Sequence, residues 1–235
     1  MTNPRFVRYE LRTTDVSAAR AFYSDLFGPD LWGSHVSVAQ LPERAAAHGA
    51  PAHWLGHLAV TDTVVTASQL AALGGAQLGP LERNSAGQAR VVMRDPFGAV
   101  LALNEDGSRA EGSPVAWHIL NVTDHERALS VYSNLFGWYR GEPITPAIDG
   151  VAARLFSFSE AEPSAGAIAN TARLPGVHTH WMLHFATPDI ERSAARVRAL
   201  GGKVVGVVQL HPGDYVAACD DAQGAAFGLR QSRND

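Results

Sequence analysis

The chain has 235 residues, of which 46% are hydrophobic and 18% charged, and its formal charge at pH 7 is -4. This composition is typical of a soluble globular protein with a hydrophobic core in one or two domains. The basic residues are scattered, which argues against nucleic acid or an anionic membrane as a partner. With no long apolar segment and a single cysteine, Cys219, we expect a cytoplasmic protein without internal disulfides.

The first predicted unit is a strand followed by a short amphipathic helix. Asp15 stands at the position of a helix N-cap, and the apolar residues after it fall at helical spacing: Ala19, Phe22, Tyr23 and Leu26. Gly28 then predicts the end of the helix. A second strand precedes Asp62, which begins a helix that stops at Gly74 and Gly75.

A β-hairpin is predicted next. Strand-like residues 89–94 and 99–103 flank the turn sequence Asp95-Pro96-Phe97-Gly98. The polar stretch 105–114, rich in Gly and Ser, is then expected to be an interdomain linker. Two further helices are predicted after it, from Asp124 to Gly137 and from Asp189 to Gly201. We interpret these glycines as helix caps and not as phosphate-binding loops.

The halves of the chain are internal repeats. Residues 53–75 align without gaps on residues 180–202 with ten identities, which include His53 and His57 on His180 and His184. Asp15 and its counterpart Asp124 are 109 residues apart, whereas Asp62 and its counterpart Asp189 are 127 residues apart. The second copy therefore has 18 more residues between its two capping aspartates. The sequence therefore predicts two similar domains, the first of which has a trimmed first module.

Several motifs resemble the vicinal oxygen chelate (VOC) superfamily of glyoxalases, bleomycin-resistance proteins and dioxygenases. They are Tyr9-Glu10-Leu11, Thr13-Thr14-Asp15, Leu26-Phe27-Gly28, His53-Trp54-Leu55, Asp95-Pro96-Phe97-Gly98 and His180-Trp181-Met182. The resemblance implies an α+β fold of four βαβββ modules that form two tandem domains with curved sheets. We expect domain 1 at residues 1–108 (modules 1–52 and 53–108), a linker at 109–116, and domain 2 at 117–235 (modules 117–177 and 178–235).

The same resemblance predicts where a metal would bind. Metal-dependent members place a ligand about seven residues before each capping Asp and a Glu about four residues after the turn glycine. These positions hold Arg8, Leu55, Trp117, Met182, Ala102 and Gly228. Because none of these side chains is a good ligand for a hard or borderline divalent ion, we expect no cofactor and no family metal site. A divalent metal on residues that do not align stays open.

The domain 1 cleft is expected to contain Glu10 and His57, each five residues before its capping Asp. A carboxylate beside an imidazole could act as an acid–base pair, or the two could form a structural pair with Arg8 or Arg12 neutralising Glu10. Strand alternation places His53 on the face of His57 and away from Trp54. Arg8 and Arg12 could also bind an anionic group of a ligand.

The domain 2 cleft is expected to be more apolar. Its candidate ligand-binding residues, placed by strand alternation and by the resemblance, are Trp117, Asn121, His180, Met182 and His184. His178, His180 and His184 could form a relocated metal site, but same-face residues of one strand stand too far apart to share one ion unless the strand breaks. The alternative is a polar pocket lining.

Three functions are compatible with these features. The first is the binding of a small organic molecule in a curved-sheet cleft without a metal. The second is a metal-dependent or metal-free lyase, isomerase or dioxygenase, the metal-free version using Glu10 and His57. The third is a degenerate domain that only supports its neighbour. We expect a small-molecule ligand and a monomer or homodimer.

Overall fold

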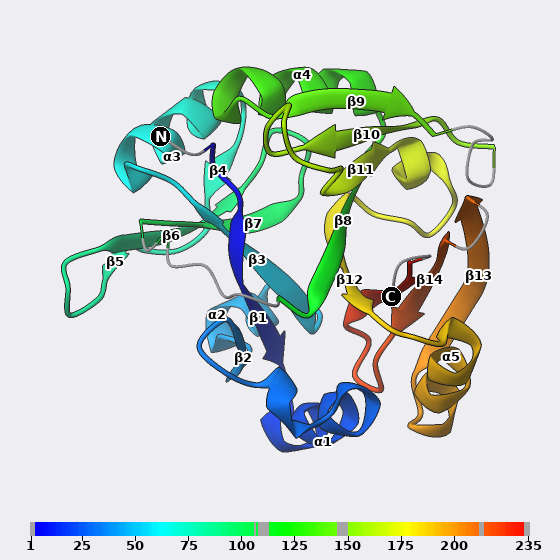
Figure 1. The fold of residues 1–235 in the computed structure, drawn as a ribbon. Helices are drawn as coiled ribbons and strands as arrows, with labels where there is room; N and C mark the ends of the chain where they lie inside the picture. The colour runs from blue at the N-terminus through cyan, green and yellow to red at the C-terminus, as the bar shows by residue number, and fades with distance from the viewer. Residues whose placement is uncertain (1–2, 106, 108–112, 145–149, 212–213, 233–235) are drawn as a thin grey trace. The chain divides into compact units, whose positions relative to one another are not determined.

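The computed structural model describes residues 3–105, 107, 113–144, 150–211 and 214–232. They form a mixed α+β fold with two curled sheets and few helices (Figure 1), which confirms the predicted fold class. Strands β1 to β7 make one sheet and β8 to β15 make the other. Among these residues no helix has the length and apolar character needed to cross a membrane.

Each of the four repeats begins with a strand and a helix. The first contains β1 (Phe6–Thr13), α1 (Val16–Phe27), η1 (Pro29–Leu31), β2 (Val36–Gln40) and α2 (Glu43–Ala47). The second contains β3 (His53–Ala59), α3 (Thr63–Ala72), β4 (Ala76–Gln77), β5 (Glu82–Arg83), β6 (Ala89–Arg94) and β7 (Val100–Asn104). The third contains β8 (Val115–Asn121), α4 (His125–Phe136), β9 (Tyr139–Pro143), β10 (Ala153–Ser157), β11 (Gly166–Ala169) and η2 (Asn170–Arg173). The fourth contains β12 (His180–Ala186), α5 (Ile190–Ala199), β13 (Lys203–His211), β14 (Asp214–Asp220) and β15 (Ala226–Gln231).

The sheets follow one connection rule. In the last three repeats the final strand returns parallel to the first, so β7 pairs with β3, β11 with β8 and β15 with β12. The strand orders are β2-β1-β3-β7-β6-β4, with β5 also paired to β6, and β13-β14-β15-β12-β8-β11-β10-β9. Between residues 3 and 52 the first repeat has one strand after α1, β2, which pairs directly with β1. The predicted trimming of the first module is therefore confirmed.

The four predicted helix starts are confirmed. Asp15, Asp62, Asp124 and Asp189 are the N-caps of α1, α3, α4 and α5, and each carboxylate accepts a hydrogen bond from the backbone N–H three residues later. This bond satisfies one of the N–H groups that a helix leaves open at its start. Gly137, with φ of 70°, ends α4 in the left-handed region that favours glycine.

The predicted hairpin is also confirmed, and its turn is held by a buried carboxylate. Asp95 Oδ1 accepts hydrogen bonds from the backbone N–H groups of Phe97, Gly98 and Ala99 at 2.8–2.9 Å. Asp221 repeats the arrangement in the last hairpin, where its Oδ1 accepts from Gln223 and Ala225. Both aspartates are at most 4% exposed, so these turns are also part of the core.

The chain divides into two compact units that each combine repeats from both halves. Unit 1 contains Met1–Val7, Gly56–Arg109 and His118–Trp181, and unit 2 contains Arg8–Leu55, Ala110–Trp117 and Met182–Asp235. Unit 1 is therefore built mainly from the second and third repeats, and unit 2 from the first and fourth. The domain boundary near residues 109–116 stays a prediction, and residues 108–112 lie outside the described part.

A hydrogen-bonded chain of three buried side chains lies in the core of unit 1. Trp181 Nε1 donates to Tyr132 Oη at 3.3 Å, and Tyr132 Oη donates to Asp95 Oδ2 at 2.8 Å. Aromatic rings surround it, with Trp138 stacked on Phe156 at 4.7 Å between centroids. The chain thereby joins three elements from different repeats: the β6–β7 turn, helix α4 and strand β12.

Unit 2 contains the counterpart of this chain. Trp54 Nε1 donates to Tyr23 Oη at 2.9 Å. Burial raises the pKa of Asp221, and the neighbouring Tyr23 hydroxyl lowers that pKa by a smaller amount. Asp221 Oδ2 has no hydrogen bond of ordinary geometry among the described residues, so its contact with Tyr23 is looser than the counterpart in unit 1. Phe185 stacks on Phe27 at 4.9 Å beside it.

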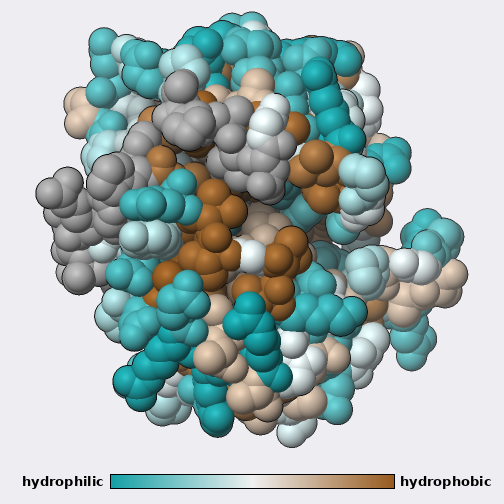
Figure 2. All heavy atoms as spheres, turned by 90° about the vertical axis from the view of Figure 1, so that its right-hand side faces the viewer, coloured by the Kyte–Doolittle hydropathy of each residue, from teal (hydrophilic) through white to brown (hydrophobic). Residues whose placement is uncertain are grey.

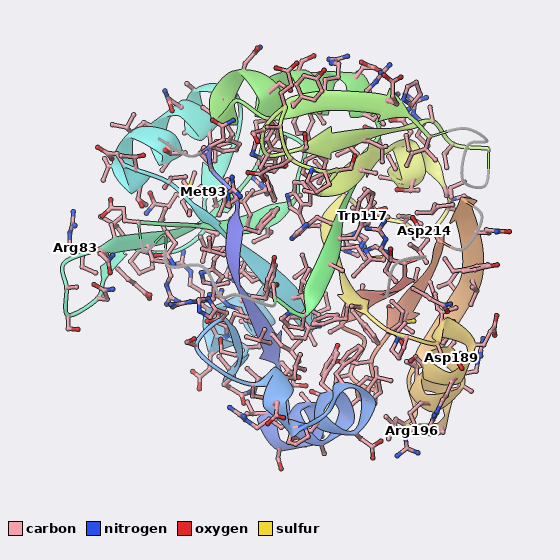
Figure 3. All side chains as sticks on the ribbon, in the orientation of Figure 1. Arg83, Met93, Trp117, Asp189, Arg196 and Asp214 are labelled. Atoms are coloured by element: carbon pink, nitrogen blue, oxygen red, sulfur yellow. The ribbon has the colours of Figure 1, made fainter. Side chains whose placement is uncertain are left out.

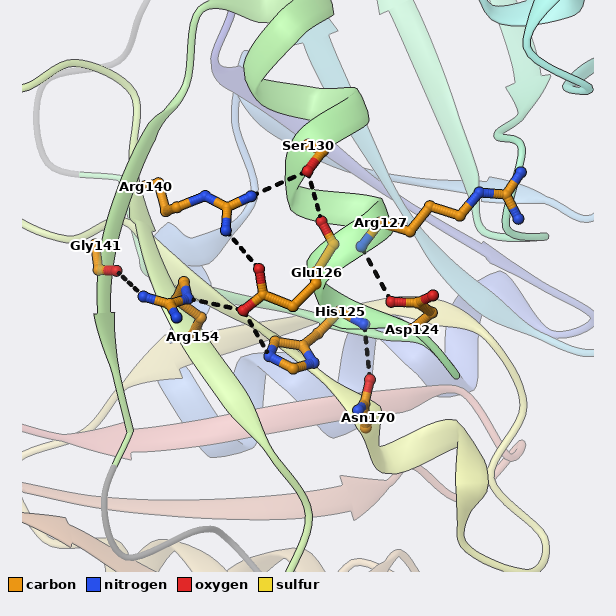
Figure 4. Close-up of polar contacts among 9 residues, drawn as sticks. All are labelled: Asp124, His125, Glu126, Arg127, Ser130, Arg140, Gly141, Arg154 and Asn170. Atoms are coloured by element: carbon orange, nitrogen blue, oxygen red, sulfur yellow. Dashed lines mark hydrogen bonds and ion pairs between the residues drawn. The ribbon is translucent and has the colours of Figure 1, made fainter.

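The start of α4 is tied to its sheet by an ion-pair cluster (Figure 4). Glu126 pairs with Arg140 of β9 and with Arg154 of β10, and His125 Nε2 lies 3.3 Å from its carboxylate. Glu126 and Arg140 are more than 40% exposed. Because exposed ion pairs contribute little free energy, we interpret the cluster as fixing helix orientation and not as a site.

Strand β13 is an edge of its sheet and carries one strongly exposed valine. It pairs with β14 alone, and Val205 is 82% exposed. Figure 2 turns the side of the molecule that carries β13 toward the viewer and shows apolar atoms near the middle of that face. An edge with unpaired backbone groups and apolar side chains can pair with another chain, but nothing among the described residues indicates an occupant.

Candidate functional site

Three of the positions at which the resemblance expects metal ligands lie on the second sheet, and all three belong to unit 2. Trp117 is on β8, Met182 on β12 and Gly228 on β15. Trp117 is 3% exposed, and its indole N–H, a donor, has no hydrogen-bond partner among the described residues. The indole N–H of Trp117 only donates hydrogen bonds, Met182 offers a thioether and Gly228 has no side chain. Together they cannot bind a hard or borderline divalent ion.

The space beside Gly228 is filled by a histidine ring. A Cβ atom added at Gly228 would lie 2.1 Å from Cδ2 of His184 and 2.4 Å from its Cγ and Nε2. The expected Glu could not occupy position 228 unless His184 moved. The predicted ligand-binding residue His184 is only 2% exposed, and here it packs against the sheet backbone.

An arginine covers the indole of Trp117, the residue labelled on β8 in Figure 3. The guanidinium carbon of Arg230 lies 4.0 Å from the ring centroid of Trp117. Asp214 of β14 holds the same guanidinium, accepting from Nε at 3.1 Å and from Nη2 at 3.0 Å. Arg230 and Asp214 are each 16% exposed. A cation thus lies over Trp117, one of the expected metal-ligand positions, but this cation is a side chain of the protein.

In unit 1, Asn121 and His180, two of the residues predicted for the domain 2 cleft, lie in contact. Asn121 Nδ2 lies 3.3 Å from His180 Nε2, and His180 Nδ1 lies 2.8 Å from the carbonyl oxygen of His178. Thr171 donates to Asn121 Oδ1, which identifies Nδ2 as the donor toward His180. Burial lowers the pKa of His180 to about 4, so the imidazole is neutral with its proton on Nδ1.

The histidines do not form a metal centre in the described structure. The rings of His178 and His180 lie 4.6 Å apart, while His184 belongs to unit 2. Among the described residues no group of three or more His, Cys, Asp or Glu side chains could hold a metal ion. The relocated metal site that the three histidines suggested is therefore not supported.

On β1, Arg8, Glu10 and Arg12 alternate with buried residues and share the less buried face of the strand. Glu10 Oε1 accepts from Arg12 Nε at 2.7 Å, and these side chains are 13% and 15% exposed. His53 lies near them: burial lowers its pKa, the Pro51 carbonyl and Glu10 raise it, and Arg12 lowers it. Unit 2 therefore gathers Glu10, Arg12 and His53, three of the residues predicted for the domain 1 cleft.

His57 belongs to unit 1 and is fully buried on β3, opposite Ala102 of β7. Trp54, its neighbour on the other strand face, packs against Tyr23, so the predicted alternation holds for Trp54. The direct pairing of Glu10 with His57 stays a prediction.

Sequence reasoning missed Arg230 and Asp214. Arg230 stands two residues after Gly228 and therefore on the same strand face, which was a usable signal. Its partner could not be found in this way, because Asp214 comes from the preceding strand, in which Val216 is the residue opposite Arg230.

Comparisons with known proteins support the resemblance. Residues 115–229 match the family model of the Glyoxalase/Bleomycin resistance protein/Dioxygenase superfamily. This half of the chain belongs to that superfamily. Across 94% of the chain and 92% of the relative, it is 26% identical to a protein named "Putative glyoxylase CFP32" in Mycobacterium bovis and in Mycobacterium tuberculosis.

Solved structures extend the likeness to the whole fold. The Mn(II)-bound glyoxalase from Novosphingobium aromaticivorans is 15% identical, with a TM-score of 0.61 over 100% of this chain and 83% of that one. The 2,3-dioxygenase LapB from Pseudomonas sp. KL28 is 14% identical, with a TM-score of 0.60 over 98% of this chain and 93% of that one. At these identities the likeness shows the two-sheet superfamily fold and nothing of the reaction.

Proposed function

We propose that this protein binds a small organic molecule on the curved sheets of the superfamily fold without the divalent metal of its metal-dependent relatives. The proposal rests on the side chains that stand at the expected metal-ligand positions of the second sheet. Trp117 lies under a guanidinium, and the imidazole of His184 fills the space of a side chain at Gly228. These residues do not fit a metal, and no step of the function passes through one.

The surroundings favour an organic ligand. Concave, mostly apolar surfaces with a few fixed polar groups are typical small-molecule sites. Unit 2 offers such a group in Arg230, whose guanidinium is held by Asp214. The structural relatives include a glyoxalase and a 2,3-dioxygenase, enzymes that act on small molecules, so the proposed ligand class follows the superfamily while the metal does not.

The decisive experiment is metal analysis of protein purified without a histidine tag. We expect less than about a tenth of an equivalent of Mn, Fe, Ni or Zn per chain, and the same melting temperature before and after dialysis against EDTA. Addition of Mn(II) or Zn(II) should leave that temperature unchanged. One stoichiometric metal that stabilises the protein would overturn the proposal.

A metal-free lyase or isomerase is the second candidate, and the Glu10 arrangement favours it. Arg12 fixes the Glu10 carboxylate, yet Glu10 is 13% exposed and so open to a small ligand as a proton acceptor. Glu10→Gln should abolish turnover of a substrate with little change in melting temperature. If the Glu10–Arg12 pair is structural, the same variant should lose about 1–3 kcal/mol of stability instead.

A further inference from the structure

We infer that Arg230, stacked on Trp117 and clamped by Asp214, is the recognition site for the carboxylate of an organic acid with an apolar body. This group of three side chains is called the Arg230 seat below. The inference rests on the proposed function, which it makes specific by naming the ligand class.

The first support is the unused edge of the guanidinium. Asp214 occupies Nε and Nη2, and among the described residues Nη1 makes no hydrogen bond. A guanidinium has five N–H donors in one plane, so the Nη1 and Nη2 edge can receive a second carboxylate in a bidentate arrangement. Since Arg230 is 16% exposed, a ligand can approach this edge.

The second support is rigidity. Trp117 fixes the plane of the guanidinium from one side at 4.0 Å, and Asp214 fixes its rotation within that plane. An arginine that is already ordered loses little conformational entropy when a ligand binds, which favours affinity. An arginine that served only to neutralise Asp214 would not need an aromatic platform.

The third support is the character of the surrounding strand face. Val216 stands opposite Arg230 and Ala218 opposite Gly228 in the β14–β15 pairing, so these small apolar residues share the face of the seat. In the β14–β15 register no other lysine or arginine stands on this face, and Lys203 of β13 lies opposite Asp220 at the far end of β14. One cation among apolar side chains suits a singly charged acid with an apolar body better than a phosphate.

The seat can be tested with benzoate as the probe, benzamide as its neutral counterpart and acetate as the acid without an apolar body. Binding is followed through the indole N–H signals of ¹⁵N-labelled protein, with Trp117→Phe used to assign the Trp117 signal. We expect benzoate to shift that signal saturably, and to bind at least about tenfold more tightly than benzamide or acetate.

Variants then connect the preference to Arg230. Arg230→Gln should remove the preference for benzoate, and Arg230→Lys should keep only part of it because an ammonium cannot form the planar fork. Arg196→Gln is the matched control, since Arg196 lies in the same unit, is 48% exposed and pairs with Asp25. It should bind benzoate as the unaltered protein does. If Arg230→Gln fails to fold, Arg230→Lys and the acid–amide comparison decide.

Two results would overturn the inference. The first is equal binding of benzoate and benzamide at Trp117, which would leave metal-free binding of an organic molecule intact while removing carboxylate recognition. The second is no shift of the Trp117 signal at tens of millimolar benzoate. A stoichiometric metal in the purified protein would instead contradict the proposed function itself, so the two failures are distinguishable.

Discussion

Replacement of Tyr132 by Phe removes one oxygen from the buried chain of Trp181, Tyr132 and Asp95. The Tyr132 hydroxyl donates to Asp95 at 2.8 Å and accepts from Trp181 at 3.3 Å. Loss of a hydrogen bond to a charged group costs about 1.5–3 kcal/mol, and a buried N–H without an acceptor adds to this. We expect the free energy of unfolding to fall by about 3 kcal/mol, which is about 6–12 °C in melting temperature for a chain of this size.

The effect should depend on pH in a definite direction. Burial raises the folded-state pKa of Asp95, and the bond from Tyr132 opposes that rise. A raised folded-state pKa gives stability that is fully present below the unfolded-state pKa and is lost as the pH rises through the folded-state value. Tyr132→Phe raises the folded-state pKa of Asp95 further, so the variant should be more destabilised near neutral pH than in mild acid.

Urea unfolding at about pH 7 and about pH 4.5 measures both quantities. Tyr23→Phe is the matched control from unit 2, where Trp54 also donates to the tyrosine but the contact of Tyr23 with Asp221 lacks ordinary hydrogen-bond geometry among the described residues. Its cost should be smaller, about 1–2 kcal/mol. Equal costs for the two variants, or a Tyr132→Phe cost that is the same at both pH values, would refute this reasoning.

Three further predictions concern single positions. Gly228→Ala should lower the free energy of unfolding by about 1–3 kcal/mol, because the new methyl group overlaps the His184 ring; urea unfolding measures this, and a cost below about 0.5 kcal/mol would mean that the ring moves freely. Asp62→Ala should cost about 1 kcal/mol in the same assay through loss of the α3 cap, and Asp62→Asn should restore most of it. His180 should titrate near pH 4 by NMR, since burial lowers its pKa; a midpoint above about 6 would contradict its buried, neutral state.

The helix starts, the hairpin and the trimmed module were predictable because each depends on neighbours in the sequence. An aspartate that caps a helix bonds to an N–H three residues away, as Asp15 does with Ala18. A turn such as Asp95 to Gly98 is stabilised by its own side chain and backbone. The internal repeat then showed that such local units recur, and an offset change between copies located the missing strands.

The core chains and the Arg230 seat were not predictable in this way, because their members come from separate repeats or strands. Tyr132 lies eight residues after its capping Asp, as Tyr23 does, so a conserved hydroxyl on two buried helix faces was visible in the repeat. The turn sequence Asp95 to Gly98 already accounted for the presence of its partner, Asp95, so nothing in the sequence indicated a contact with Tyr132. Only the packing of α4 near the β6–β7 turn shows that this carboxylate has a second role.

Among the described residues of the second sheet, the side chains at the expected ligand positions do not form a metal-binding set, and this follows from their packing and not from one missing ligand. A glutamate at position 228 would collide with His184, and a histidine at position 117 would remove the platform under Arg230. The residues that replace the ligands therefore support one another, which makes reversal by a single substitution unfavourable. Since strand pairing and helix caps do not depend on these side chains, the superfamily fold is kept while the chemistry of the sheet face changes. A TM-score of 0.61 to a manganese-bound glyoxalase is consequently compatible with the metal-free binding that we propose for this chain.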